Sequence, residues 1–98
     1  MSRSVVVRYR TTPETAEENQ RLVEQVFASL ADSRPEGLHY VTLRLADGVT
    51  FVHVASQDGD ALSGLPAFQE FQRELAARVE APPDASAATV VGSYRVFD

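Results

Sequence analysis

Residues 42–56 read TLRLADGVTFVHVAS, and the turn at their centre decides the fold. Asp47-Gly48 is typical of a two-residue hairpin turn of type I′, in which both residues need a positive φ angle. The flanking segments are rich in alternating β-branched and apolar residues, as strands are. We therefore predict a β-hairpin with strands over 38–46 and 49–56, in which Ala46 pairs with Val49.

This register divides the hairpin into two faces, and a slip of one residue would mix them. The aliphatic face pairs Val41 with Val54, Leu43 with Val52 and Leu45 with Thr50. The other face alternates polar and aromatic groups and pairs Tyr40 with Ala55, Thr42 with His53 and Arg44 with Phe51. We expect the aliphatic face to pack against helices. We expect the mixed face, joined by Arg8 and Arg10 of an earlier strand, to point away from them.

The rest of the chain completes a β-α-β-β-α-β order. Strand patterns cover 4–11 and 88–97, and helical patterns run from Thr12-Pro13 to about Ser33 and from Pro66 to Pro82-Pro83. This order is typical of the α+β ferredoxin-like fold, a four-stranded antiparallel sheet with both helices on one face. We expect a single domain over 1–98. In the last strand two sets compete for the helix side: Val90, Tyr94 and Val96 against Val91, Arg95 and Phe97.

Composition excludes several classes of function. The chain is 44% hydrophobic with a net charge of −5, and its arginines are scattered, so a nucleic-acid surface is not expected. No apolar run is long enough to span a bilayer and no signal-peptide pattern precedes the first strand, which favours the cytoplasm. There is no Cys and no Lys, which removes thiolate and Schiff-base chemistry. We expect no cofactor and no metal, because His39 and His53 fall on opposite faces of their strands.

The predicted helix-free face is too apolar to be left in water. A patch that combines Tyr40, Phe51, Ala55 and Val6 on a scale of a few hundred Å² usually marks an interface. The simplest cover is the same face of a second copy, in an isologous two-fold contact. We therefore expect a homodimer through the helix-free face, which would enclose a cavity of aromatic and polar groups.

The chain resembles the dimeric α/β-barrel superfamily, and especially small antibiotic biosynthesis monooxygenase-like proteins. The resemblance rests on the element order, the ADG hairpin and the segment SGLPAFQEFQREL that opens the second helix. It implies a homodimer with a pocket between the sheet and the helices of each protomer. Members include cofactor-independent oxygenases and haem-degrading enzymes. Those enzymes rely on Trp and Asn residues. This sequence has no Trp, and its only Asn, Asn19, lies on the first predicted helix. The resemblance therefore carries over no catalytic residue.

Five residues are candidates for ligand binding: Arg8, Tyr40, Arg44, Phe51 and His53. His53 could orient or deprotonate a phenolic ligand, or it could be a packed histidine bonded to Tyr40 or Thr42 across the dimer. Arg8 and Arg44 could bind a carboxylate or enolate, or pair with carboxylates of the partner. Tyr40 and Phe51 could form an apolar wall or simply fill the interface.

Two hypotheses for function remain open at this point. The first is a small-molecule pocket in a dimeric barrel, as in a cofactor-independent oxygenase or isomerase acting on a small aromatic or enolisable ligand. The second is a non-catalytic dimeric binding or interaction module in which the same residues only hold the interface together. Substitution of His53 discriminates between them, because it would abolish ligand binding in the first case and reduce stability in the second.

Overall fold

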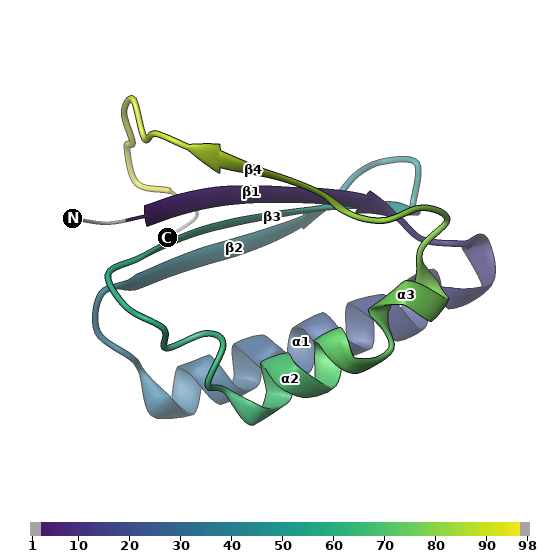
Figure 1. The fold of residues 1–98 in the computed structure, drawn as a ribbon, viewed down its shortest axis with the longest axis horizontal. Helices are drawn as coiled ribbons and strands as arrows, with labels where there is room; N and C mark the ends of the chain where they lie inside the picture. The colour runs from purple at the N-terminus through teal and green to yellow at the C-terminus, as the bar shows by residue number, and fades with distance from the viewer. Residues whose placement is uncertain (1–2, 97–98) are drawn as a thin grey trace.

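The computed structural model describes residues 3–96, which form an antiparallel sheet with helices against one face (Figure 1). The strands are β1 (Arg3–Arg10), β2 (Leu38–Arg44), β3 (Thr50–Gln57) and β4 (Asp84–Ala88). The helices are the 3-10 turn η1 (Pro13–Thr15), α1 (Ala16–Ser33), α2 (Pro66–Arg73) and α3 (Leu75–Arg78). The strand order across the sheet is β2-β3-β1-β4, which confirms the predicted ferredoxin-like fold.

The helices begin and end near the expected residues. Thr12 is extended and Pro13 occupies the first position of η1, which continues directly into α1. α1 ends at Arg34, which adopts a left-handed conformation with φ of 46° and donates its N–H to the Leu30 carbonyl at 2.8 Å. The predicted second helix is broken at Glu74 into α2 and α3. None of the helices in the described residues is both long enough and apolar enough to cross a membrane.

The hairpin has the predicted register. Arg44 lies opposite Phe51, and Thr42 lies opposite His53. The same strand β3 pairs on its other side with β1, where Val7 lies opposite His53. β3 is thus an interior strand, with hydrogen-bonded neighbours on both sides.

The turn of the hairpin differs from the prediction. Gly48 has φ of 80° and donates its N–H to the Leu45 carbonyl at 3.0 Å, but Asp47 has no positive φ. The type I′ prediction is therefore wrong, because that turn needs two positive φ angles. The Asp47 carboxylate instead accepts hydrogen bonds from the N–H groups of Val49 and Thr50, both at 2.9 Å, and from the Thr50 hydroxyl at 2.6 Å. The longer loop is symmetric about the hairpin axis, so the strand pairing is unchanged.

The two faces of the hairpin are reversed from the prediction. Phe51, His53 and Ala55 are buried in the core together with Tyr9 of β1, whereas Leu43 is 38% exposed. The mixed face therefore packs against the helices, and the aliphatic face points away from them. The buried cluster contains Tyr9, Leu22, Val23, Val26, Phe51, Ala55, Leu62 and Phe71.

The helices explain this reversal. Besides aliphatic side chains, they present aromatic rings and polar groups to the sheet: Phe27 of α1 stacks on Tyr40, and Phe71 of α2 lies against the His53 ring. Asn19 of α1 is fully buried and hydrogen-bonds the Tyr9 hydroxyl. Aromatic pairing and satisfied polar groups thus outweigh the aliphatic character of the other face.

Arg8 is separated from the other predicted site residues by the sheet itself. It lies opposite Val52 of β3 and Asp84 of β4, while the next residue along β1, Tyr9, points into the core. Neighbouring residues of a strand point to opposite faces. The prediction that Arg8 shares a face with His53 is therefore wrong.

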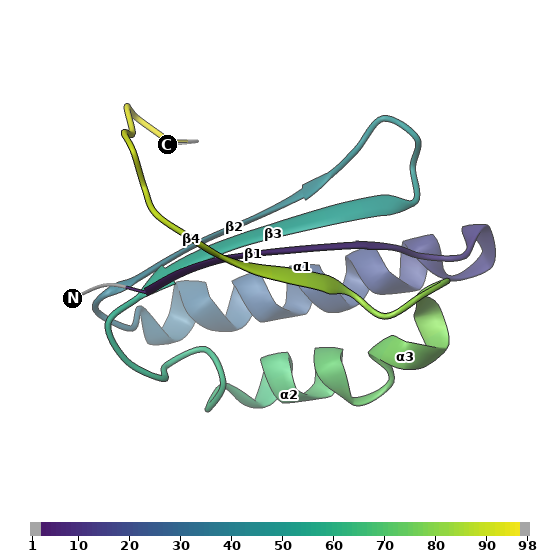
Figure 2. The same cartoon turned by 45° about the horizontal axis from the view of Figure 1, so that its top comes forward.

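The last strand is also placed differently. β4 covers 84–88, a segment of small and polar residues paired with β1, and not the predicted 88–97. Residues 89–96 leave the sheet and turn toward the side opposite the helices (Figures 1 and 2). Val91 is 99% exposed and Tyr94 is also largely exposed. Neither competing set of the last strand is packed on the helices, and Phe97 lies outside the described residues.

Candidate functional site

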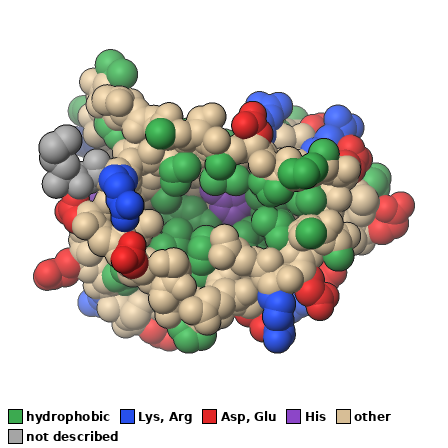
Figure 3. Space-filling model, viewed as in Figure 1, with side chains coloured by type: hydrophobic (Ala, Val, Ile, Leu, Met, Phe, Trp, Pro, Cys, Tyr) green, Lys and Arg blue, Asp and Glu red, His purple; other side chains and the backbone are tan. Residues whose placement is uncertain are grey.

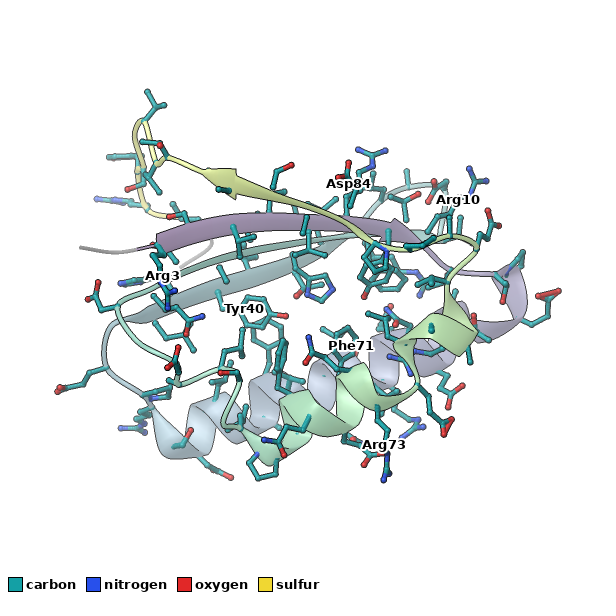
Figure 4. The ribbon with its side chains drawn as sticks, viewed as in Figure 1. Arg3, Arg10, Tyr40, Phe71, Arg73 and Asp84 are labelled. Atoms are coloured by element: carbon teal, nitrogen blue, oxygen red, sulfur yellow. The ribbon has the colours of Figure 1, made fainter. Side chains whose placement is uncertain are left out.

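A small apolar pocket opens between the sheet and α2, with a histidine at its floor (Figure 3). It has a volume of about 100 Å³. Its lining is mostly ring and aliphatic side chains: Val5, Val7, Tyr9, Tyr40, His53, Ala55, Leu62, Phe68, Phe71, Gln72 and Leu75. Tyr40 from β2 and Phe71 from α2 point toward one another across the space between the layers (Figure 4). The pocket is thus a place where a flat apolar molecule would meet one imidazole and two phenols.

His53 is hydrogen-bonded at both ring nitrogens and is only 6% exposed. Its Nε2 lies 2.8 Å from the Tyr9 hydroxyl. Its Nδ1 lies 2.6 Å from the Tyr40 hydroxyl and 3.1 Å from the Thr42 hydroxyl. The hydrogen bonds from His53 to Tyr40 and Thr42 therefore form within one chain. One of the alternatives predicted from the sequence placed these contacts across a dimer.

The network continues from Tyr9 to the helices. The Asn19 amide donates through Nδ2 to the Tyr9 hydroxyl at 2.9 Å. Arg78 of α3 donates through Nε to Asn19 Oδ1 at 3.0 Å and through Nη2 to the Phe71 carbonyl at 2.6 Å. Arg78 is 3% exposed, and its guanidinium lies 5.3 Å from the Phe71 ring centre. A continuous polar chain thus runs from a buried cation to the floor of the pocket.

Burial controls the protonation of these groups. Desolvation lowers the pKa of His53 from 6.5 to about 4, so the imidazole is neutral near pH 7. Desolvation raises the pKa of Tyr40 to about 12, opposed in part by the Thr42 hydroxyl. Desolvation also raises the pKa of Tyr9, although the hydrogen bond from Asn19 opposes it. The site therefore holds a neutral imidazole between two neutral phenols.

Arg44 lies at the other end of the sheet–helix interface. Its guanidinium donates to the Gly48 carbonyl, to Gln20 at 2.6 Å and to Glu17 at 3.0 Å. It also lies 5.6 Å from the Phe51 ring centre. The predicted carboxylate partner therefore exists, but it belongs to α1 of the same chain.

The structure brings together some of the predicted residues and separates others. Tyr40 and His53 share the pocket. Phe51 is buried beneath it and stacks on Tyr9 at 5.7 Å. Arg44 and Phe51 line a separate depression that also contains Thr42. Arg8 is on the opposite face of the sheet, as described above.

Sequence reasoning missed Tyr9, Asn19 and Arg78. For Asn19 and Arg78, the position in the helix could have indicated that the side chain is buried. Asn19 falls three and four residues before Leu22 and Val23, inside the buried stripe of α1. Arg78 falls seven residues after the buried Phe71. A polar residue at a buried helical position needs a buried partner, and that requirement marks it as part of a network.

No group of three or more His, Cys, Asp or Glu residues that could hold a metal ion occurs in 3–96. The pocket offers stacking surfaces and hydroxyl groups. These suit a small organic molecule with one oxygen substituent better than a charged cofactor.

No protein-family model matches the sequence, and no curated protein matches it. Solved structures do match in fold. Rv0793 from Mycobacterium tuberculosis has a TM-score of 0.71 at 17% identity, with 95% of this chain and 98% of that chain covered. An antibiotic biosynthesis monooxygenase has a TM-score of 0.72 at 14% identity, covering 94% and 100%.

A variant of SnoaB, a cofactor-independent oxygenase from Streptomyces nogalater, has a TM-score of 0.68 at 19% identity, with 96% of this chain and 97% of that chain covered. Identities this low indicate a shared fold and nothing finer. The resemblance in fold to antibiotic biosynthesis monooxygenase-like proteins is thereby confirmed.

Proposed function

We propose that the pocket above His53 binds a small aromatic or enolisable compound and that the chain acts on it as a cofactor-independent oxygenase. The observation that carries this proposal is the buried imidazole held between Tyr9 and Tyr40 at the floor of an apolar pocket. Titratable groups with shifted pKa values in such cavities are candidates for functional sites.

The size of the pocket limits the ligand. A cavity of about 150 Å³ in another protein holds one benzene molecule, and the pocket here measures about 100 Å³. The pocket is therefore smaller than that cavity, and because it opens between the sheet and α2, a single-ring compound would fill it and extend into its mouth. Phe68, half-buried, and Gln72, exposed, line the pocket from α2 and are the side chains that would move for a larger one.

The chemistry needs no bound group, since an enolate can itself reduce O₂. In that reaction a CH₂ group beside a carbonyl loses a proton, and the enolate formed supplies electrons to O₂. The sum is one CH₂ group and one O₂ converted to one carbonyl and one water. Tyr40, hydrogen-bonded to His53 Nδ1, would hold the ligand oxygen and exchange a proton with it, and the apolar walls would exclude water. The fold shared with SnoaB supports this reaction class.

The test is a screen of single-ring phenols, hydroquinones and cyclic ketones for binding and for oxygen uptake. We expect at least one compound to bind saturably and to consume O₂, and we expect His53→Ala to abolish both. His39→Ala is the matched control, because His39 is exposed on the opposite face of the sheet. Absence of binding across the panel would overturn the proposal and leave the non-catalytic module as the better description.

We also propose that two copies associate through the helix-free face. The support is its composition: half-buried or exposed aliphatic side chains on three adjacent strands, namely Val6, Val41, Leu43, Val52 and Val54. The segment 89–96 borders this face, with Val90, Gly92, Ser93 and Val96 lining the same depression as Val41 and Val54. The observation equally favours the second candidate function, a dimeric interaction module. Native mass spectrometry at micromolar concentration tests it, and a monomer would overturn the dimer.

A further inference from the structure

A series of hydrogen bonds runs from Arg78 through Asn19, Tyr9 and His53 to Tyr40 at the pocket. Arg78 fixes which group donates in each of them. An arginine guanidinium can only donate hydrogen bonds. Because Arg78 Nε donates to Asn19, the atom that it contacts must be the amide oxygen. The Asn19 amide nitrogen is then the group that faces Tyr9, and it donates to the Tyr9 oxygen at 2.9 Å.

The direction passes on to His53. The Tyr9 oxygen accepts from Asn19, so the Tyr9 proton needs an acceptor, and Nε2 of His53 lies 2.8 Å away. If Nε2 carried the proton instead, the Tyr9 oxygen would face two donors and its own buried proton would have no partner in this network. The satisfied arrangement therefore has Nε2 unprotonated and the proton of the neutral ring on Nδ1.

The same direction reaches the pocket through Tyr40. With its proton on Nδ1, His53 donates to the Tyr40 oxygen at 2.6 Å, and the Thr42 oxygen shares that proton at 3.1 Å. The Tyr40 proton is then not needed by His53. Tyr40 lines the pocket, and its hydroxyl also lies beside the Thr42 hydroxyl, so this proton has two possible acceptors, the Thr42 oxygen and an oxygen of a bound molecule. Every donor in the chain points from the buried cation toward the ligand, an arrangement in which successive hydrogen bonds strengthen one another.

We propose that Arg78 and Asn19 are positioning residues that hold His53 in the Nδ1–H tautomer, so that Tyr40 presents a hydrogen-bond donor to the ligand. This rests on the proposed function and names the ligand class of that site. The site selects an oxygen that accepts a hydrogen bond, as in a carbonyl, an enolate or a phenolate. It favours an oxygen that can only accept over a hydroxyl group, which also needs an acceptor for its own proton.

The tautomer is directly measurable by long-range ¹H–¹⁵N NMR of the histidine side chains. The chain has two histidines, and the exposed His39 serves as the internal reference. We expect His53 near pH 7 to show the Nδ1–H pattern. An Nε2–H pattern in the wild-type protein would overturn the proposal without the need for any variant.

Asn19→Asp keeps the shape of the side chain and should reverse the direction of the hydrogen bonds between residue 19, Tyr9 and His53. The new carboxylate still accepts from Arg78, but it also accepts from Tyr9, so the Tyr9 proton turns toward it. Nε2 must then donate to the Tyr9 oxygen, and we expect His53 to switch to the Nε2–H tautomer. Gln25→Glu adds the same charge on the exposed side of α1 and should leave the tautomer unchanged. An unchanged tautomer in a folded Asn19→Asp variant would overturn the positioning role.

The ligand class is tested with two single-ring probes of the same shape, cyclohexanone, which carries an acceptor oxygen, and methylenecyclohexane, which carries none. We expect the wild-type protein to bind cyclohexanone at least tenfold more tightly than methylenecyclohexane. Asn19→Asp and Tyr40→Phe should remove this preference. Equal binding of the two probes would overturn the donor assignment and leave the proposed function intact. No binding at all would overturn both the ligand class and the proposed function, while the tautomer result would still decide the role of Asn19 and Arg78.

Discussion

Arg78 donates a hydrogen bond to Asn19 at 3.0 Å, and both side chains are buried between the sheet and the helices. A lone arginine at this depth would be costly. It is tolerated because its donors meet the Asn19 oxygen and the Phe71 carbonyl while its plane lies over the Phe71 ring. The contact thus links α1 to α3 and anchors the polar chain that reaches His53.

Removal of this cation should destabilise the protein strongly. Arg78→Ala leaves two buried acceptors without a donor, and we expect a loss of about 2–4 kcal/mol in the free energy of unfolding. Urea denaturation of the variant measures this loss. Arg73→Ala is the control, since Arg73 is exposed and its ion pair with Glu70 at 2.7 Å is a surface contact screened by solvent. Equal effects of the two substitutions would contradict the role of Arg78.

The stability of the protein should decrease in mild acid because of His53. Its pKa is about 4 in the folded chain and near 6.5 when unfolded, so the unfolded state binds a proton first as the pH falls. Stability is therefore fully present above about pH 6.5 and is lost as the pH falls toward 4, by on the order of 3 kcal/mol. Urea midpoints between pH 7 and 4 measure this loss, with His53→Gln as the comparison. A pH dependence that is the same in His53→Gln and in the wild-type protein would rule out this source.

The architecture could be predicted from the sequence because the patterns that determine it are local. The element order, the helix start at Thr12-Pro13 and the register of the hairpin follow from patterns within a few residues of each turn. Even the wrong turn type left the register intact, because the loop between Leu45 and Thr50 remained symmetric.

The face of the hairpin could not be predicted in the same way. Both assignments of face keep identical strand pairs, so alternation alone does not choose between them. The choice depends on what the helices bring to the sheet, and Asn19, Phe71 and Arg78 come from distant parts of the chain. The register fixed Thr42 as the partner of His53 and put Tyr40 on the same face, but it did not fix whether that face lies inside the protein.

The reversed faces make a direct prediction for substitutions at adjacent residues. Phe51 is 2% exposed, and Phe51→Ala should cost about 3–5 kcal/mol by leaving a cavity in the core. Leu43→Ala, on the 38% exposed outer face, should cost much less in an isolated chain. Chemical denaturation at low protein concentration compares the two. The opposite order of stability would restore the face assignment made from the sequence.

A charge on the outer face should affect association and spare the fold. In the proposed dimer, Val54→Glu places a carboxylate between Val6 and Val41 in an apolar interface, where it would be desolvated without a partner. We expect the variant to stay folded by circular dichroism and to shift toward monomer in sedimentation or native mass spectrometry. Gln25→Glu is the matched control, because it adds the same charge at an exposed position of α1, away from this face. A dimer that tolerates Val54→Glu would have to use another surface.

The segment 89–96 should contribute to the same association. It is rich in residues that favour strands, yet it pairs with no strand among residues 3–96, and Val90, Val91 and Tyr94 are largely exposed. A second copy could supply the missing partner across the outer face. Val90→Ser combined with Val91→Ser should therefore weaken the dimer at least tenfold. The same pair should leave monomer stability within about 0.5 kcal/mol, the range expected for exposed positions. Unchanged dimer affinity, measured by dilution in analytical ultracentrifugation, would show that residues 89–96 take no part in pairing and that the aliphatic sheet face alone would have to hold the two copies together.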